Sequence, residues 1–317
     1  MTWNAMRVTG LRLEQPGILG LELSPADGQP LATTWEAGAH VDLRLPGGLV
    51  RQYSLAGLPT DGRMLIAVKR EAQSRGGSQW LHEQLRIDTL LDVGPPRNLF
   101  KLTSGNGPVV LIAAGIGLTP LLAMYRQCLA EGRPVRLLGF SRAPRAPRLL
   151  EDLAGDVQWH GGLAAARIAE LLPLQLGTWQ AGSTLYTCGP AGFMDRVQTT
   201  AVELGWPEDA LHREHFQPAA QPGTAVTLED NCELVLARSG TRVSVQPGES
   251  LANAAARAGT LLPLSCGMGI CGACVTRVIE GEADHRDDCL TPAQRASGEW
   301  IAPCVSGCRG ERLVLDA

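Results

Sequence analysis

The stretch Cys266-Gly-Met-Gly-Ile-Cys271-Gly-Ala-Cys274 is the most informative part of the chain, because three cysteines share one short loop. A fourth, Cys304, follows after twenty-nine intervening residues. The spacing C-x4-C-x2-C-x29-C is typical of a plant-type 2Fe-2S cluster. The loop's glycines allow the backbone to wrap tightly and to point N–H groups at the sulfurs. A zinc site is the alternative, but it usually pairs two short Cys/His hooks. We therefore predict an electron-transfer protein with cluster ligands Cys266, Cys271, Cys274 and Cys304.

The remaining cysteines bear on the choice of the fourth ligand and on the compartment. Cys289 and Cys308 lie near Cys304, and spacing alone excludes neither from its place. We favour Cys304 because an apolar segment, residues 300–303, leads into it. Of nine cysteines, five remain beyond the four ligands. An odd remainder without a signal peptide argues for a reducing compartment and against a disulfide framework, so we expect a cytoplasmic protein.

Length and composition indicate a globular protein of several domains. The 317 residues are enough for two or three domains, and 44% hydrophobic with 19% charged residues is an ordinary globular composition. No apolar run is long enough to span a bilayer. The net charge of −4 arises entirely in residues 224–317, where it either steers a basic partner or forms a solvated surface. We expect neither a nucleic acid nor a membrane as partner.

Two stretches rich in turn residues divide the chain. Residues 217–223 lack apolar periodicity and charge, which predicts a linker. Residues 103–108 form the second such stretch. We therefore predict three domains, with boundaries 1–103, 104–223 and 224–317.

Each predicted domain has its own pattern of elements. The first has short β-rich segments between Gly, Pro and Asp turns, typical of an antiparallel barrel: residues 18–23, 40–45, 50–55 and 64–68. The second alternates apolar strands with an apolar helix, typical of a parallel α/β sheet: strands 109–113, 135–140 and 185–187, and helix 121–129. The third begins with a hairpin over 234–245, then a helix 251–258 that Ser250 caps and Gly259 ends.

The predicted α/β domain carries two glycine turns. Gly115-Ile-Gly117-Leu-Thr119-Pro120 lies between a strand and a helix, where amides can bind a pyrophosphate. The fingerprint is incomplete, because Pro120 takes the sixth position and no acid ends the next strand. Alone, it is explained equally well as a tight strand-to-helix turn. Cys188-Gly189-Pro190 also follows a strand, and two such turns at the carboxyl ends of parallel strands predict a nucleotide crevice.

The predicted barrel carries a candidate flavin site. Arg51-Gln52-Tyr53-Ser54 offers a cation, an aromatic ring and a hydroxyl on one strand, although Tyr53 alone is better explained as a packed residue. Arg75-Gly76-Gly77-Ser78 places a basic residue before two glycines and a helix-starting serine, as in a phosphate cradle. Together the two motifs predict a phosphorylated flavin.

The order R-x-Y-S, R-G-G-S, G-x-G-x-T-P, C-G-P and then the cysteine loop resembles the phthalate dioxygenase reductase family, and within it the vanillate O-demethylase reductase branch. The resemblance spans essentially the whole chain. It implies a flavin-binding β-barrel, an α/β nucleotide-binding domain like that of ferredoxin-NADP reductase, and a C-terminal β-grasp ferredoxin domain. It also implies a monomeric reductase that passes electrons from NADH through FMN and a 2Fe-2S cluster to a Rieske-type oxygenase in aromatic catabolism.

The resemblance assigns roles residue by residue. Ser54 would lie near the reactive flavin nitrogen and Cys188 near the nicotinamide, as the catalytic pair. The FMN would contact Arg51, Gln52, Tyr53, Ser54, Ala67, Val68, Lys69, Arg75, Gly76, Gly77 and Ser78. The nicotinamide nucleotide would contact Gly115, Gly117, Thr119, Cys188, Gly189 and Pro190. Phe216 would cover the flavin face, with a packed boundary aromatic as the alternative. His212 and His215 are interpreted as structural.

Electron counting supports this order of cofactors. A nicotinamide gives two electrons as a hydride, whereas a 2Fe-2S cluster accepts one, so a flavin must stand between them. Met268 and Ile270 in the cluster loop are candidates for the docking surface or for the domain core. Alternatives left open are FAD in place of FMN, a haem-thiolate monooxygenase as acceptor, a non-catalytic nucleotide sensor, and NADPH bound through Arg142, Arg145 and Arg148.

Overall fold

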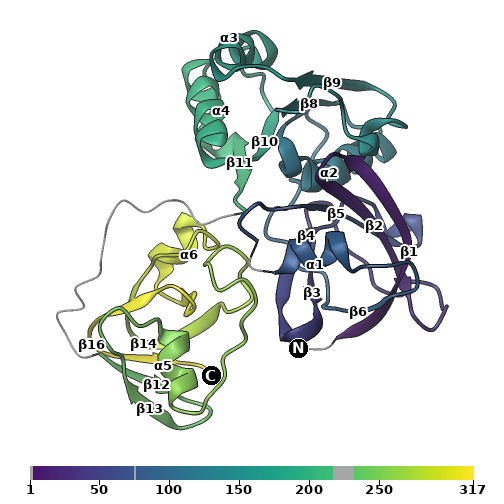
Figure 1. Cartoon of the computed structure of the whole chain (residues 1–317). Coiled ribbons are helices and arrows are strands. Elements are labelled where there is room, and N and C mark those ends of the chain that lie inside the picture. Colours follow the sequence, from purple (N-terminus) through teal and green to yellow (C-terminus); the bar gives the residue numbers. More distant parts are fainter. Residues whose placement is uncertain (1–2, 75, 217–231) are drawn as a thin grey trace. The chain divides into compact units, whose positions relative to one another are not determined.

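The computed structural model in Figure 1 describes residues 3–74, 76–216 and 232–317. These residues form two compact units, 1–214 and 215–317. The first unit contains two sheets and the second contains one. The boundary predicted near residue 103 falls between the two sheets of the first unit, and the predicted linker 217–223 lies outside the described residues.

The first sheet is antiparallel, in the order β4-β3-β6-β1-β2-β5. An isolated bridge between Leu55 and Ile66, with the Ala56 amide donating to Leu65 at 2.8 Å, connects its two edges. This confirms the predicted antiparallel barrel. The strands are β1 (Asn4–Gln15), β2 (Ile18–Pro25), β3 (His40–Arg44), β4 (Val50–Ser54), β5 (Met64–Lys69) and β6 (Leu90–Val93).

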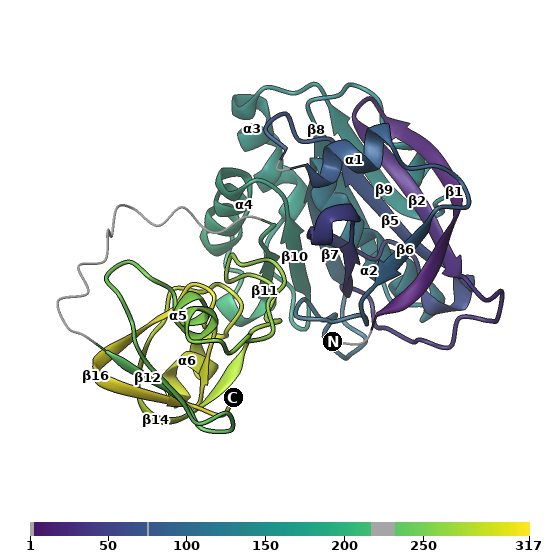
Figure 2. The same cartoon turned by 60° about the horizontal axis from the view of Figure 1, so that its bottom comes forward.

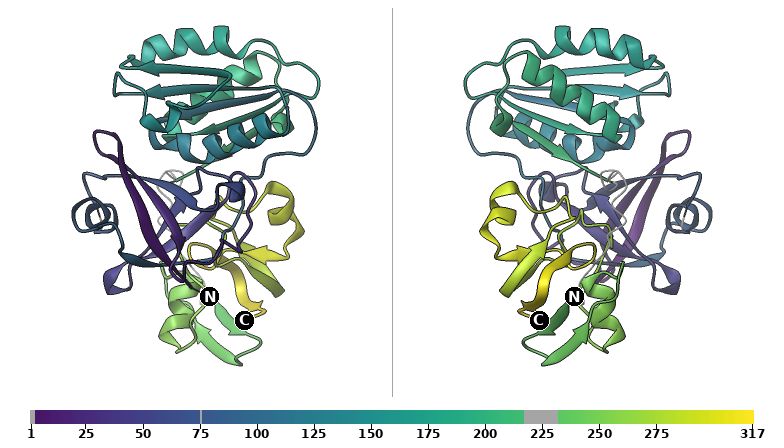
Figure 3. Two further views of the ribbon diagram at one scale, coloured as in Figure 1. Left: turned by 90° about the vertical axis from the view of Figure 1, so that its right-hand side faces the viewer. Right: turned by 90° about the vertical axis from the view of Figure 1, so that its left-hand side faces the viewer.

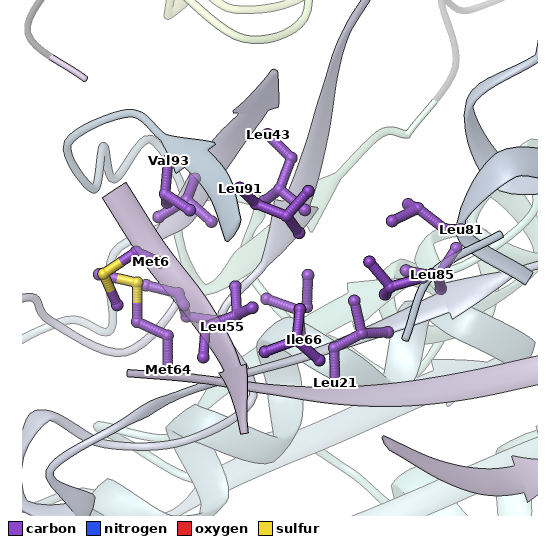
Figure 4. Packing of buried hydrophobic residues seen from close by; sticks show 14 of the residues in the cluster. Met6, Leu21, Leu43, Leu55, Met64, Ile66, Leu81, Leu85, Leu91 and Val93 are labelled. Atoms are coloured by element: carbon purple, nitrogen blue, oxygen red, sulfur yellow. The ribbon is translucent and has the colours of Figure 1, made fainter. Parts of the chain in front are cut away.

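Side chains at alternate positions of these strands point inward and fill the interior of the barrel. Leu21 and Leu23 of β2 and Val41 and Leu43 of β3 are fully buried in one cluster, which Figure 4 shows from close by. Leu81 of α1 (Gly77–Glu83) joins the same cluster. The short helix is therefore anchored to the barrel by its apolar side.

The second sheet is parallel throughout, in the order β11-β10-β7-β8-β9. Its strands are β7 (Val109–Ala114), β8 (Val135–Ser141), β9 (Asp156–Gly161), β10 (Thr184–Cys188) and β11 (Leu211–Glu214). Helices α3 (Ala165–Leu176) and α4 (Ala191–Glu203) pack with Ile112 and Phe140, while α2 (Leu118–Ala130) lies on the opposite face (Figure 3). Helices on both faces of a parallel sheet confirm the predicted α/β class.

Helix α2 also packs on the barrel. Leu122 of α2 and Leu149, in a 3-10 turn (Arg148–Leu150), are buried with Ala56 and Ala67 of the barrel. The segment between the sheets is held by the buried Arg133, which donates to the carbonyls of Thr103 and Gly107, both at 2.7 Å. The two sheets of the first unit therefore share a packed interface.

The second unit, drawn in green and yellow in Figure 2, has a sheet in the order β13-β12-β16-β14-β15. Its strands are β12 (Glu233–Leu236), β13 (Thr241–Ser244), β14 (Thr276–Asp284), β15 (Trp300–Ile301) and β16 (Gly307–Leu315). The predicted hairpin is confirmed as β12 and β13. Helix α5 (Leu251–Arg257) begins where expected, since the Ser250 hydroxyl accepts from the Asn253 amide at 3.2 Å. Helix α6 (Pro292–Ser297) follows β14.

One covalent link in the second unit corrects an expectation. Cys232 and Cys308 form a disulfide with Cα atoms 6.5 Å apart, whereas the odd cysteine count argued against a disulfide framework. The strands β12 and β16 pair in parallel, which brings these two buried cysteines together from 76 residues apart. Counting cysteines does not reveal such a pairing.

Among the described helices, none is both long and apolar enough to cross a bilayer.

Candidate electron-transfer site

The cysteine loop has the backbone that its glycines predict. Gly267, Gly269 and Gly272 all adopt left-handed conformations, with φ between +65° and +72°. Side chains other than glycine are strained there. The resulting curl lets the Met268 amide donate to the Cys266 sulfur at 3.2 Å and the Ala273 amide to the Cys271 sulfur at 3.5 Å. These N–H groups favour negative charge on the sulfurs, as a cluster requires.

The four predicted ligands lie in two pairs. The thiol of Cys271 raises the pKa of Cys266, and the thiol of Cys274 raises the pKa of Cys304, so the members of each pair interact directly. Within the described ranges, no three His, Cys, Asp or Glu side chains are arranged to hold a single metal ion. Two thiol pairs match a centre with two irons, each of which takes two cysteines.

The structure distinguishes between the three candidates for the fourth cluster ligand, Cys289, Cys304 and Cys308. Cys308 is taken by the disulfide with Cys232, whereas Cys304 contacts Cys274 directly. Cys289 lies near the loop, because its amide donates to the Gly269 carbonyl at 3.0 Å. Asp287 accepts from the Cys289 thiol at 3.6 Å. The structure thus brings Cys304, the sequence-based choice, to the other predicted ligands.

The two glycine turns of the parallel sheet are in close contact. Gly115 has φ +58°, and a short 3-10 turn (Gly115–Gly117) leads directly into α2. A Cβ atom on Gly117 would lie 2.2 Å from the Cys188 carbonyl oxygen, and one on Gly189 would lie 2.8 Å from the Ala114 Cβ. The turns therefore need glycine for backbone approach. They lie together at the carboxyl ends of the neighbouring strands β7 and β10, and a nucleotide crevice there stays a prediction.

Two other predicted nucleotide contacts have structural tasks in these turns. The Thr119 hydroxyl donates to the Ile116 carbonyl at 3.0 Å and is buried, so it fixes the first turn from within. Pro190 precedes α4 and its carbonyl accepts from the Phe193 amide at 3.0 Å. Both residues shape the two turns, and their contact with a nucleotide stays a prediction.

Glu214 is a candidate residue that the sequence analysis missed. It pairs with Cys188 across β10 and β11, and its Oε2 is buried without a hydrogen-bond partner in the described part of the chain. Burial raises the pKa of Glu214 to about 8, and burial together with Glu214 raises the pKa of Cys188 well above its usual value. A neutral carboxyl group can donate a hydrogen bond, which a carboxylate cannot. The only sequence signal was an acid at the end of a strand.

The predicted flavin strand is β4, where alternate side chains face opposite sides. Tyr53 packs against the barrel core, and burial raises the pKa of its phenol. Ser54, on the other side, is 6% exposed and pairs with His40 of β3. Gln52 shares the Ser54 face and pairs with Asp42, which holds Arg97 in a bidentate ion pair at 2.8 and 2.9 Å. Ala67 and Val68 of β5 are buried.

The predicted phosphate cradle is partly described. A Cβ atom on Gly77 would lie 2.8 Å from the Arg51 Cγ, so Arg51 lies against the start of α1. Gly76 has φ +91°, which requires glycine. Arg75 lies outside the described residues. The Ser78 hydroxyl accepts from the Glu71 amide at 3.1 Å and Lys69 pairs with Glu71 at 3.0 Å, so both hold the preceding loop.

The remaining sequence-based assignments have mixed support. Phe216 belongs to the second unit, so its predicted position over the flavin stays a prediction. His212 stacks on Tyr186 with ring centres 4.6 Å apart, in agreement with a structural role. Arg142 and Arg145 are exposed after β8, and Arg148 pairs with Glu151 at 3.2 Å.

Comparison with known proteins agrees with this arrangement. Residues 234–309 match the family of 2Fe-2S iron-sulfur cluster binding domains. The chain is 38% identical over 315 residues to the vanillate O-demethylase oxidoreductase of Pseudomonas sp. (strain HR199 / DSM 7063), covering 98% of each chain.

Two solved structures resemble the whole chain. Phthalate dioxygenase reductase, described as a modular structure for electron transfer from pyridine nucleotides to 2Fe-2S, is 31% identical with a TM-score of 0.69, over 99% of this chain and 98% of that one. An intact type IV self-sufficient cytochrome P450 monooxygenase is 33% identical with a TM-score of 0.87. The match covers 99% of this chain but only 41% of that P450 chain.

The antiparallel barrel, the parallel α/β sheet and the 2Fe-2S domain occur here in the same order as in these relatives, and the likeness extends over nearly the full chain. The chain therefore belongs to the phthalate dioxygenase reductase-like family of oxidoreductases, with a sequence similar to the vanillate O-demethylase oxidoreductases.

Proposed function

We propose that this protein is the NADH-dependent reductase of a Rieske-type aromatic oxygenase or O-demethylase, with FMN and one 2Fe-2S cluster as cofactors. The observation that carries this proposal is the presence, in one chain, of a paired-thiol loop and a double glycine turn beside a flavin-type strand. Two of the relatives named above are a vanillate O-demethylase oxidoreductase and phthalate dioxygenase reductase. NADH is a reductant of the cytoplasm, where we place the protein as a monomer.

The residues fit a 2Fe-2S cluster. Cys266 with Cys271, and Cys274 with Cys304, would each hold one iron, while amide donors support the charge on the sulfurs. When bound, the cluster would accept and release one electron at a time. Met268 and Ile270 are half-buried in this loop and belong to the surface that we propose for contact with the oxygenase.

The first unit fits a flavin phosphate and a dinucleotide. Arg51 beside Gly77 offers a cation to the phosphate of FMN, and Ser54 is the hydroxyl that we place near the reactive ring nitrogen. The turns at Gly117 and Gly189, which approach each other closely beside Cys188, would bind the nicotinamide nucleotide, and a neutral Glu214 would orient the carboxamide and keep charge away from the site. FMN would accept a hydride and pass on single electrons. The chain's residues bind, orient and exclude water.

A second acceptor has specific support. The similarity to the reductase-like 41% of a cytochrome P450 chain makes a haem-thiolate monooxygenase the alternative partner. The first unit and cluster domain would serve either acceptor with the same chemistry. Reconstitution of product formation with each class of oxygenase distinguishes the two.

Two artificial acceptors test the proposed electron path. Ferricyanide takes electrons directly from a reduced flavin, whereas cytochrome c reports on electrons that pass through the cluster. We expect rapid reduction of both by NADH and at least tenfold slower reduction with NADPH, because one of the three candidate arginines, Arg148, is already paired with Glu151. Equal rates with both nucleotides would contradict the choice of NADH.

Substitution of a ligand separates the two halves of the path. Cys271→Ala should remove the cluster absorbance and the cytochrome c activity while ferricyanide reduction remains near its original rate. Cys128→Ala is the matched control, since this buried cysteine lies on α2 and has no place in the cluster loop. A Cys271→Ala protein that keeps its cluster would overturn the ligand assignment.

A further inference from the structure

Helix α2 connects the nucleotide turn with the flavin strand. It begins directly after Gly117, and its later residue Arg126 reaches the barrel, where Nη1 donates to the Ala56 carbonyl at 2.7 Å. Ala56 follows Ser54 by two residues and is fully buried. The Arg126 side chain therefore joins α2, which follows the Gly115–Gly117 turn, to the end of β4, the strand that carries Ser54.

The surroundings of Arg126 are unfavourable for a cation. It lines a cavity of about 260 Å³ together with Arg12 and Arg63, and the carboxyl groups of Glu14, Glu22 and Asp152 line the same cavity. Burial lowers the pKa of Arg126; these two arginines lower it further, and Asp61 and Asp152 offset part of the effect. The neighbouring interface is apolar, with Leu122 and Leu149 packed there. An apolar side chain would fit such an interface without desolvating a charge.

The directional hydrogen bond explains why a cation is kept there. The Ala56 amide already donates to Leu65, and Arg126 is the donor to the Ala56 carbonyl. A guanidinium group is planar and presents several donors in a fixed geometry. It can therefore fix both the distance and the orientation between α2 and the end of β4. Apolar packing alone would leave these two elements able to slide past one another.

We propose that Arg126 is a positioning residue for hydride transfer, which sets the nicotinamide-binding turn at reacting distance from the flavin-binding strand. This inference rests on the proposed function. Its bond to Ala56 holds α2, and with it Gly117 and Cys188, against β4. Loss of the bond leaves both cofactor sites intact but lets their separation vary. A misplacement of about 1 Å costs on the order of a hundredfold in rate.

Rapid mixing of the holoprotein with NADH under anaerobic conditions tests this role. The measured quantities are the limiting rate of flavin bleaching, the NADH concentration at half that rate, and the long-wavelength charge-transfer absorbance of nicotinamide stacked on flavin. We expect Arg126→Met to lower the limiting rate by about tenfold to a hundredfold. The charge-transfer absorbance should fall with it, while the half-saturating NADH concentration and the flavin content stay within about twofold. Arg126→Lys, which keeps a donor, should recover part of both signals.

Arg136→Met is the matched control, because Arg136 also donates to a carbonyl, that of Leu176 at 2.9 Å, but within the nucleotide-binding sheet and its helix. It should behave like the unchanged protein. Unchanged rate and absorbance in Arg126→Met, or an equal loss in Arg136→Met, would overturn the positioning role. If Arg126→Met loses its flavin, Arg126→Leu replaces it, and equal rates for Arg126→Leu and Arg126→Lys would overturn the role. Absence of bleaching in the unchanged protein would overturn the proposed function as well.

Discussion

Replacement of Gly117 by alanine tests the close contact of the two glycine turns. The new Cβ would lie 2.2 Å from the Cys188 oxygen, 2.4 Å from the Cys188 carbonyl carbon and 2.7 Å from the Gly189 nitrogen. Ordinary contacts begin at 3.4 Å, and all three atoms belong to backbone, which cannot rotate away. The turns must therefore separate by about 1 Å, in the range in which misplacement slows a reaction strongly.

Two magnitudes follow for Gly117→Ala. Overpacking of this kind costs roughly 1–3 kcal/mol. For a unit of 214 residues, this corresponds to a lower thermal midpoint by roughly 2–12 °C. Since the nucleotide turn moves relative to Cys188, we also expect at least a tenfold lower limiting rate of flavin reduction by NADH, or a matching rise in the half-saturating NADH concentration.

Gly192→Ala is the matched control for this experiment. Gly192 lies in α4 just beyond the second turn, and a Cβ there would have no heavy atom within 4 Å. Alanine in a helix is favoured over glycine by about 0.5–1 kcal/mol. The midpoint should therefore stay the same or rise slightly, with unchanged NADH kinetics. A Gly117→Ala protein with the same midpoint and NADH rate as Gly192→Ala would refute the packing argument.

Three further predictions concern buried charge and the disulfide. Because burial raises the pKa of Glu214 to about 8, the folded state loses stability as the pH rises from the usual carboxyl range through 8. Glu214→Gln does not titrate, so its unfolding free energy, measured in urea, should rise relative to that of the unchanged protein by about 2 kcal/mol as the pH goes from 6 to 8. Arg97→Met removes the bidentate cation partner of the fully buried Asp42 carboxylate and should cost about 3–5 kcal/mol. Asp92→Asn, which breaks the exposed pair with Arg44, should cost less than about 1 kcal/mol in the same titration. Reduction of Cys232–Cys308, which closes a loop of 76 residues, should lower the stability of the second unit by about 4 kcal/mol, and an unchanged thermal midpoint with reductant would contradict this.

The sequence predicted the elements whose patterns are regular. The apolar strands β7, β8 and β10 and the alternating strands β2 to β5 were found within a few residues of their observed bounds. β1 was missed, although it is the longest strand of the barrel, because register shifts at Val8/Gly10 and Leu13/Gln15 interrupt its alternation. β14 was missed for the same reason, with shifts on both sides of Glu280. A bulge reverses the faces of all later residues, so periodicity fails there.

The site was predictable where chemistry depends on local spacing. The cysteine loop and both glycine turns could be read directly, since each functional group lies within nine residues of the next. Glu214 and Arg126 could not be read in this way. Their significance depends on burial and on partners about 26 and 70 residues away, Cys188 and Ala56, which only the packed structure brings together.

An anaerobic titration with NADH, followed by visible spectroscopy and low-temperature EPR, tests the proposed electron path most directly. A flavin takes two electrons and a 2Fe-2S cluster one, so full reduction should require about 1.5 equivalents of NADH per chain. We predict bleaching of both the flavin and the iron-sulfur bands, with a rhombic signal from one reduced cluster per chain. Reduction complete at about one equivalent, with flavin bleached and no cluster signal, would contradict a path from nicotinamide through flavin to a 2Fe-2S centre.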